Sequence, residues 1–345
     1  MEDGQAPAPR ERGWKGLLLA LAAFLLLPLP VLSALRGLLP ISETIALLVP
    51  ALAVCFVVGW CMGGRVTLAI LWLGLAAWGL TRPIAPSAPA SYNDLARCWT
   101  LLVAGAFGVI SLVSPTQRLF SRALSATGLA LILALVVMTV AGRRPEQAER
   151  VFAEEFSRRG TAYTAAVQAQ LQAARTGGSE GVTPALREFF EQSVQQMSQM
   201  SRIATPLYPA LLGLESLAAF ALAWALYHRL SRSRLGPPLG PLREFRFNDQ
   251  LIWGFVAGLV IVLLPNLASL HAAGGNLLLF FGSLYALRGF GVVAWLISRV
   301  RGGRMASTLA ILGVVLFWPL VMPSALGLGL ADTWLDWRRR PRPAP

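Results

Sequence analysis

Charged residues are scarce in this chain. They make up 14% of its 345 residues, whereas hydrophobic residues make up 55%. Soluble domains carry roughly 25% charged residues, and a soluble core cannot enclose so much apolar surface. The composition therefore excludes an ordinary soluble globular protein and indicates a membrane protein.

Histidine and cysteine are also rare, with two and three residues. The cysteines are Cys55, Cys61 and Cys98, and they form no Cys-x-x-Cys pair. A metal site would need ligands that this chain hardly has. We therefore interpret the cysteines as packing residues, and we expect neither a metal nor a cofactor.

The sequence lacks the short motifs of common enzymes. It has no His-Glu-x-x-His, no Gly-x-Ser-x-Gly and no Gly-rich loop of the GxxxxGK[ST] type. Its two histidines suggest no Ser-His-Asp set. We therefore expect that the protein is not an enzyme, and an ATP-driven machine would need its motor on another chain.

Basic charge is in excess, with a formal net charge of +13 at pH 7. Such a charge could indicate a nucleic-acid partner. However, the basic residues lie mostly at the ends of apolar runs rather than in one stripe. We therefore interpret them as membrane-flanking charge and expect the lipid bilayer, not nucleic acid, as the partner.

Long apolar runs dominate the chain. A helix needs about 20 apolar residues to cross the hydrocarbon core of a bilayer, and somewhat fewer where the bilayer thins. The predicted spans are residues 14–35, 41–62, 66–80, 99–113, 123–141, 206–226, 251–270, 276–297 and 305–321, with a weaker tenth at 322–337. The sequence thus predicts an all-α, polytopic integral membrane helix bundle with eight to ten transmembrane helices.

The loop arginines predict the orientation, because basic residues in short loops are retained in the cytoplasm. A cytoplasmic N-terminus places most of them inside, so we expect a multi-pass protein of the bacterial plasma (inner) membrane. The basic tail at 338–342 would lie outside if 305–337 crossed only once. Because a proline pair can end a helix, Pro319 and Pro323 favour a short hairpin that returns this tail to the cytoplasm.

One polar insertion, 142–205, separates an N-terminal five-span half, 1–141, from a C-terminal membrane half with a basic tail, 206–345. Two stretches of the insertion have apolar residues at helical spacing, and Gly177, Gly178 and Gly181 lie between them. This predicts two amphipathic helices outside the membrane, on the extracytoplasmic side. They could form a structural extension, lie on the lipid surface or meet a partner.

Two charges fall in the middle of predicted spans. Glu215 lies nine residues into one span and Arg288 twelve residues into another that runs in the same direction. Charges at the bilayer centre are costly, so they usually face the bundle interior and find a partner or a watery cavity. At 1.5 Å per residue, the two side chains would lie at a similar depth, and we expect an ion pair. That pair could fix helix packing or line a polar ligand site.

Polar residues accompany these charges. Asn266 follows Pro265 near the end of the seventh predicted span, and Tyr285 precedes Arg288 by three residues. We therefore expect a ligand site between spans six to eight formed by Glu215, Asn266, Tyr285 and Arg288, although close helix packing would explain the same residues. Near the C-terminus, Asp332 and Asp336 are one helical turn apart, and we interpret them as partners of nearby arginines rather than catalytic groups.

The C-terminal part resembles a known family. The segments that carry the likeness are Leu242-Arg-Glu-Phe-Arg-Phe-Asn248, Pro265-Asn266, Leu284-Tyr-Ala-Leu-Arg-Gly-Phe290 and the ending Leu328-Gly-Leu-Ala-Asp-Thr-Trp-Leu-Asp-Trp-Arg338. Over residues 206–340 the chain resembles the YybS-like family of polytopic bacterial membrane proteins. That family looks broadly like the substrate-capturing membrane components of vitamin transporters and like a cell-shape protein, which is an analogy of fold and assigns no function.

Two functions of different classes follow from these observations. The first is a transporter-like or small-ligand-binding bundle with a polar site between spans six to eight. The alternative is a non-catalytic envelope-assembly or scaffold protein with a membrane or envelope protein partner, in which the same charges only hold the helices together. A membrane enzyme is the weaker third hypothesis.

Overall fold

The computed structural model describes residues 41–85, 87–176, 195, 203–231, 235–299, 313 and 318–338. Regular structure in these residues is entirely helical. The chain forms two compact units: unit 1 is Met1–Tyr208 with Leu212–Leu239, and unit 2 is Pro209–Leu211 with Gly240–Pro345. The boundary between the two units differs from the boundaries of the three predicted segments. The reason is that the first helix of the insertion and most of the sixth predicted span pack with the N-terminal helices.

Several described helices are long and apolar enough to cross a membrane. Five of them qualify: Glu43–Cys61, Ala90–Val113, Leu119–Val140, Thr205–Leu230 and Pro265–Ile297. Three shorter apolar helices are Val66–Thr81, Asp249–Leu263 and Leu320–Leu335. The expectation of an all-α, multi-pass membrane bundle is confirmed. The predicted span 14–35 and most of 305–321 lie outside the described residues.

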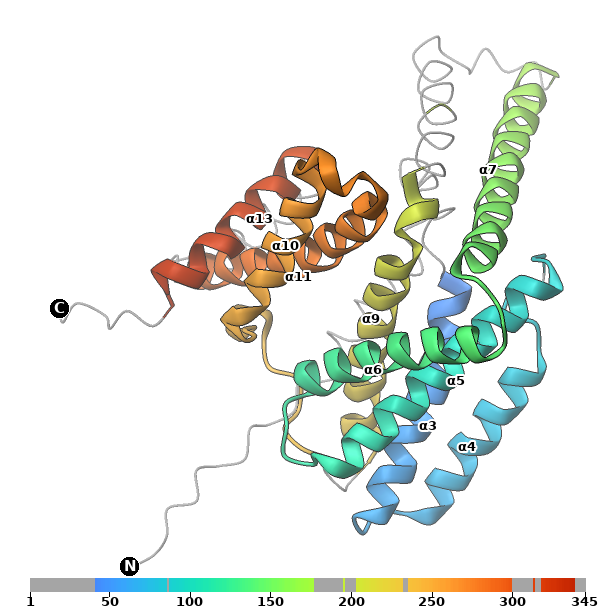
Figure 1. The fold of residues 1–345 in the computed structure, drawn as a ribbon. Coiled ribbons are helices and arrows are strands. Elements are labelled where there is room, and N and C mark those ends of the chain that lie inside the picture. The colour runs from blue at the N-terminus through green and yellow to red at the C-terminus, as the bar shows by residue number, and fades with distance from the viewer. Residues whose placement is uncertain are drawn as a thin grey trace, which may run out of the picture. The chain divides into compact units, whose positions relative to one another are not determined.

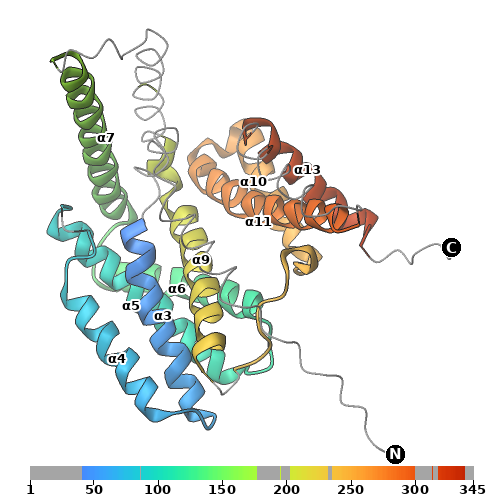
Figure 2. The same cartoon turned by 180° about the vertical axis from the view of Figure 1, so that it is seen from behind.

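The described residues of unit 1 form six α-helices, whose arrangement is shown in Figures 1 and 2. They are α3 (Ile41–Cys61), α4 (Val66–Thr81), α5 (Ala90–Val113), α6 (Leu119–Val140), α7 (Pro145–Thr176) and α9 (Tyr208–Leu230), with the 3-10 turn η2 (Thr205–Leu207) before α9. A turn with Gly63 at φ 93° joins α3 to α4. A positive φ is costly for residues with a Cβ, so glycine suits this turn.

Aromatic residues fill the core between α3, α5 and α9. Phe107 stacks on Phe220 with ring centroids 4.2 Å apart, and Phe56 meets Tyr227 edge to face at 5.1 Å. Gly59 on α3 faces the Tyr227 ring so closely that an added Cβ would overlap the hydroxyl. Complementary sizes across these helices therefore set their close approach.

One end of unit 1 is closed by the loop after α9. Arg122, which is 0% exposed, donates hydrogen bonds to the carbonyls of Pro115 and Leu235 and lies over the Trp224 ring. His228 bridges the carbonyls of Trp224 and Gly236. Arg122 was predicted to be a membrane-flanking loop charge, but the structure buries it because backbone carbonyls and a ring face replace its water.

The first insertion helix is confirmed, because α7 runs over Pro145–Thr176; the predicted glycine break lies outside the described residues. Its buried face includes Ala148, Phe152 and Phe156. Phe152 stacks on Tyr208 at 4.3 Å, so α7 packs on the bundle rather than projecting freely along its whole length. The second predicted helix lies outside the described residues.

Unit 2 contains α10 (Ile252–Leu263), α11 (His271–Ile297) and α13 (Trp318–Leu335), with the 3-10 turns η3 (Leu242–Glu244), η4 (Asp249–Leu251) and η5 (Pro265–Leu270). The predicted continuous span at 251–270 is wrong, because Leu264 is extended (φ −88°, ψ 114°) and α10 ends before Pro265. A residue that precedes proline is disfavoured in helical conformation, and proline itself has no N–H to continue the ladder.

Glycines set the packing in unit 2. A Cβ on Gly289 would overlap the backbone of Ala325, and one on Gly329 would overlap the carbonyl of Tyr285. Helices α11 and α13 therefore meet backbone to backbone, as small residues allow in membranes. Helix α13 continues through Pro319 and Pro323, so a turn at this proline pair is wrong; the first half of the predicted hairpin lies mostly outside the described residues. The contact of α13 with α11 offsets the backbone hydrogen bond that Pro323 cannot donate.

Candidate functional site: an ionic cluster in unit 1

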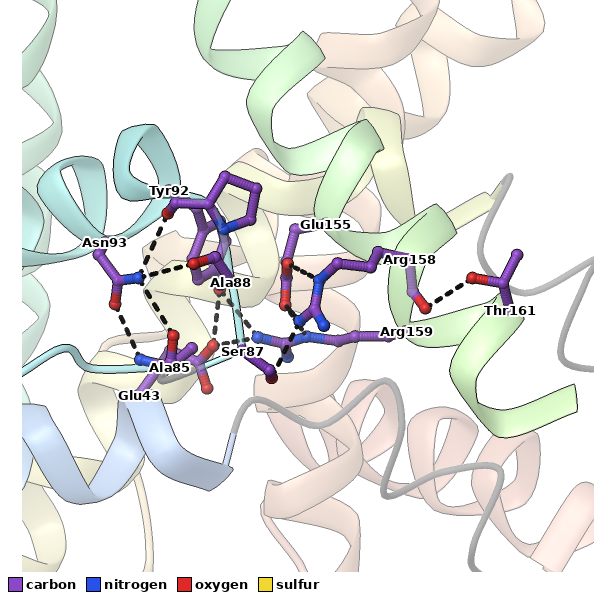
Figure 3. Close-up of polar contacts among 11 residues, drawn as sticks. Glu43, Ala85, Ser87, Ala88, Tyr92, Asn93, Glu155, Arg158, Arg159 and Thr161 are labelled. Carbon is purple, nitrogen blue, oxygen red and sulfur yellow. Dashed lines mark hydrogen bonds and ion pairs between the residues drawn. The ribbon is translucent and has the colours of Figure 1, made fainter. Parts of the chain in front are cut away.

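A cluster of opposite charges joins α7 to the helix bundle of unit 1 (Figure 3). Glu43 comes from the first turn of α3 and Tyr92 from the first turn of α5, and both are buried. The Tyr92 hydroxyl donates a hydrogen bond of 2.7 Å to Glu43 Oε1. Arg159 reaches over from α7, donates to the same Glu43 oxygen and lies 5.5 Å from the centre of the Tyr92 ring.

Glu155 completes the α7 side of the cluster. Its side chain is 2% exposed and accepts hydrogen bonds from Arg158 at 2.6 Å and from Arg159 Nε at 2.7 Å. Burial acts to raise the pKa of Glu155, but the hydrogen bonds from the two arginines outweigh it and hold this pKa below its usual value. Burial acts to lower the pKa of Arg159, but Glu43 and its other partners raise this pKa above the usual value. Both groups therefore stay charged.

The loop between α4 and α5 is held by one amide side chain. Asn93 Oδ1 accepts from the Ala85 N–H at 2.9 Å, and Nδ2 donates to the carbonyls of Ala85, Ala88 and Pro89. Figure 3 shows these bonds beside Tyr92. Because Asn93 follows Tyr92 directly, they fix the start of α5 and thereby the position of the Tyr92 hydroxyl.

Glu215 lies deeper in the same unit. The Thr44 hydroxyl, from α3, donates to Glu215 Oε1 at 3.1 Å. The neighbouring Ser216 accepts a bond of 3.1 Å from the Trp99 indole, so α3, α5 and α9 meet here through polar contacts. Glu215 Oε2 is shielded from solvent, and among the residues described it has no hydrogen-bond partner. Glu215 thus differs from Glu43 and Glu155, which both hold a guanidinium.

Arg288 belongs to a second network, within unit 2. It donates to Asp332 Oδ2 at 2.9 Å and to Asp249 Oδ1 at 2.6 Å. Asp332 is 0% exposed and also pairs with Arg338 at 2.6 Å, while Arg246 pairs with Asp336 at 2.8 Å. The interpretation of Asp332 as a partner of a nearby arginine is confirmed, whereas Asp336 pairs with Arg246 from a distant part of the chain.

Glu215 and Arg288 each have partners within their own unit: Thr44 for Glu215, and Asp249 and Asp332 for Arg288. Asp249 lies in the short turn η4 before α10, just outside the predicted span 251–270. The ion pair of Glu215 with Arg288 and the four-residue ligand site stay predictions, because Glu215 belongs to unit 1 and the other three residues to unit 2. Tyr285 is buried near Arg288, with Phe247 in contact with both, but Asn266 is exposed in η5.

Sequence reasoning missed the cluster residues Glu43, Tyr92 and Arg159. Glu43 is the third residue of a predicted span, and charges are common at span ends, so hydropathy does not distinguish this one. The insertion helix supplied a weaker signal, because Glu155, Arg158 and Arg159 are spaced to share one face near its apolar stripe. Only the packing of α7 on α5 and η2 brings them to α3.

Within the described part of the chain, no three His, Cys, Asp or Glu residues come together as metal ligands. A hollow of about 690 Å³ in unit 2 is lined by Arg243, Glu244, Trp295, Ser298 and Arg299. Its lining includes neither Glu215 nor Arg288.

Comparison with known families gives one match. The model of the family described as "Predicted membrane protein (DUF2232)" covers residues 100–333. The match is consistent with the resemblance over 206–340 and extends it to most of α5, but it does not confirm the narrower YybS-like name. No curated protein and no solved structure matches the chain.

Proposed function

We propose that this chain, which belongs to the DUF2232 family of predicted membrane proteins, is a transporter-like membrane protein that binds a small solute at the ionic cluster of unit 1. The site moves from spans six to eight, where it was first predicted, to the end of unit 1 formed by α3, α5, α7 and α9. Glu215 is the one residue common to both sites.

The observation that carries this proposal is the unpartnered oxygen of Glu215. Ionisable residues inside membrane helices are costly and are usually retained for ligands, ions or protons. Glu215 sits in an apolar helix with one hydroxyl partner, Thr44, and a shielded Oε2 that has no partner among the described residues. A residue kept only for packing would gain stability by completing its hydrogen bonds.

The charge of the cluster favours a positively charged solute. Glu43 and Glu155 are balanced by Arg158 and Arg159. A charged Glu215 therefore leaves one surplus negative charge, which an ammonium or another small cation would neutralise.

Helix α7 acts as the cover of the site in this proposal. Arg159 bonds to Glu43 of the bundle and to Glu155 of its own helix. We call the ion pair of Arg159 with Glu43 the clamp, and a solute reaching Glu215 must pass it when this ion pair breaks. We place the protein in the bacterial plasma membrane with the cluster and α7 on the extracytoplasmic side. The distribution of loop arginines supports this orientation.

Methylammonium is a suitable probe, and binding can be followed as a rise in the thermal unfolding temperature of the purified protein in detergent. We expect methylammonium chloride to raise this temperature more than equal sodium chloride. Glu215→Gln should remove the rise. Glu154→Gln makes the same chemical change at an exposed position of α7 and should retain it. The proposal fails if methylammonium acts no better than sodium chloride on the wild type.

A scaffold protein is the second candidate, and the unit 2 network favours it. Arg288 and Asp332 are almost completely buried and pair with each other. Arg288 also pairs with Asp249, and Asp332 also pairs with Arg338. Such a network can fix helix packing without binding anything. In the scaffold hypothesis, substitutions at Glu215 and Arg288 change the stability of the protein but no solute changes its unfolding temperature, and a membrane or envelope protein is the partner.

A further inference from the structure

We infer that Glu215 carries a dissociable proton when the site is empty, and that a cationic solute binds by displacing this proton. The identity of the competing solute rests on the proposed function. The presence of the proton does not, because it is argued from the surroundings of the carboxylate alone.

The groups that face Glu215 come from three elements. Thr44 and Glu43 come from α3, Tyr92 from α5 and Arg159 from α7. Arg159 is the cation among them, and it is engaged by Glu43 and Glu155. Glu43 is itself a carboxylate and repels a negative charge on Glu215. The nearest direct partner of Glu215 is therefore a neutral hydroxyl.

A neutral Glu215 balances the cluster. With a proton on Glu215, the two carboxylates Glu43 and Glu155 match the two guanidiniums Arg158 and Arg159 in charge. Without it, a negative charge remains in an apolar helix, where an uncompensated charge costs far more than a protonated carboxyl group. A larger ion would need a cavity beside Glu215, whereas a proton needs none because it binds to the carboxylate oxygen itself.

The exchange conserves charge and atoms. The O–H bond of the Glu215 carboxyl breaks, the proton passes to water, and an N–H of the ammonium then donates a hydrogen bond to the carboxylate oxygen. The cluster is neutral before and after this step. Solute uptake is thereby coupled to release of one proton, which is the arrangement that cation–proton exchange requires.

Infrared spectroscopy of the purified protein, with no solute added, tests the proton directly. The C=O stretch of a protonated buried carboxyl group should be present at neutral pH and should disappear as the pH rises. Glu215→Gln should lack this band, whereas Glu154→Gln should retain it. If the wild type and Glu215→Gln show the same carboxyl bands over the whole pH range, Glu215 is ionised throughout and the inference is wrong.

Thr44→Val gives a second test if Glu215→Gln does not fold. This change removes the hydroxyl that donates to Glu215 Oε1 and thus the bond that favours the ionised form, so the carboxyl band should persist to higher pH. An unchanged titration would contradict the inference.

Adding methylammonium in weak buffer with a pH indicator separates the two proposals. A carboxyl band together with proton release on addition supports both. A carboxyl band without any methylammonium effect supports the proton on Glu215 and overturns the proposed function. Methylammonium binding without a carboxyl band supports the proposed function and overturns the proton on Glu215, because the site then binds a cation at a carboxylate that was already ionised.

Discussion

The clamp between α7 and the bundle can be tested by Arg159→Met, which removes the guanidinium and keeps an apolar side chain of similar length. Glu43 and Glu155 are 7% and 2% exposed and both bond to Arg159. Removing one partner of a buried ion pair typically costs about 3–5 kcal/mol, because the other charge stays buried without compensation. Glu155 keeps Arg158, so the cost arises mainly at Glu43 and should lie near the lower end of that range.

The free energy of unfolding in detergent measures this cost. Arg150→Met is a matched control, because Arg150 is exposed on the same helix and surface substitutions usually change stability by less than about 0.5 kcal/mol. The double variant Glu43→Gln/Arg159→Met should regain part of the loss, since it no longer buries the uncompensated Glu43 carboxylate. If Arg159→Met is as stable as Arg150→Met, the cluster does not hold α7 and the reasoning is refuted.

Three other expectations can be checked by unfolding measurements. Arg288→Met should destabilise the protein by about 3 kcal/mol, the lower end of the range for a buried pair, because Asp332 is completely buried but keeps Arg338, whereas Arg246→Met, at a more exposed pair, should cost much less; equal costs would contradict the network. Gly289→Ala should cost about 1–3 kcal/mol through overlap with Ala325, whereas Gly105→Ala, where a Cβ meets open space, should not destabilise. The pKa of Glu155 is lowered on folding, so its stabilisation is complete above the unfolded pKa of about 4.3 and is lost as the pH falls through the lower folded pKa. Glu155→Gln should therefore flatten the acid limb of a stability–pH profile, and an unchanged limb would show that Glu155 does not contribute to it.

Much of the fold could be predicted from local sequence. The apolar run 41–62 becomes α3, and the first amphipathic stretch of the insertion becomes α7. These predictions succeed because hydropathy and helical spacing depend only on neighbours along the chain. The predictions at the prolines failed in opposite ways. Pro265 ended a helix inside a predicted span, whereas Pro323 did not end one, because contact with α11 holds α13 together.

The candidate site was predicted only in part. Glu215 was identified because a charge in an apolar run stands out in any sequence. Its partner within unit 1, Thr44, was not expected, because hydropathy does not show which helices pack together. The sequence by itself determined that this chain is a multi-pass helical membrane protein with buried charges that need compensation. Only the tertiary structure decided that Arg288 is neutralised within unit 2, and that Glu215 has one oxygen without a hydrogen-bond partner among the described residues, because compensation of charge depends on the distance between atoms that are far apart in the chain.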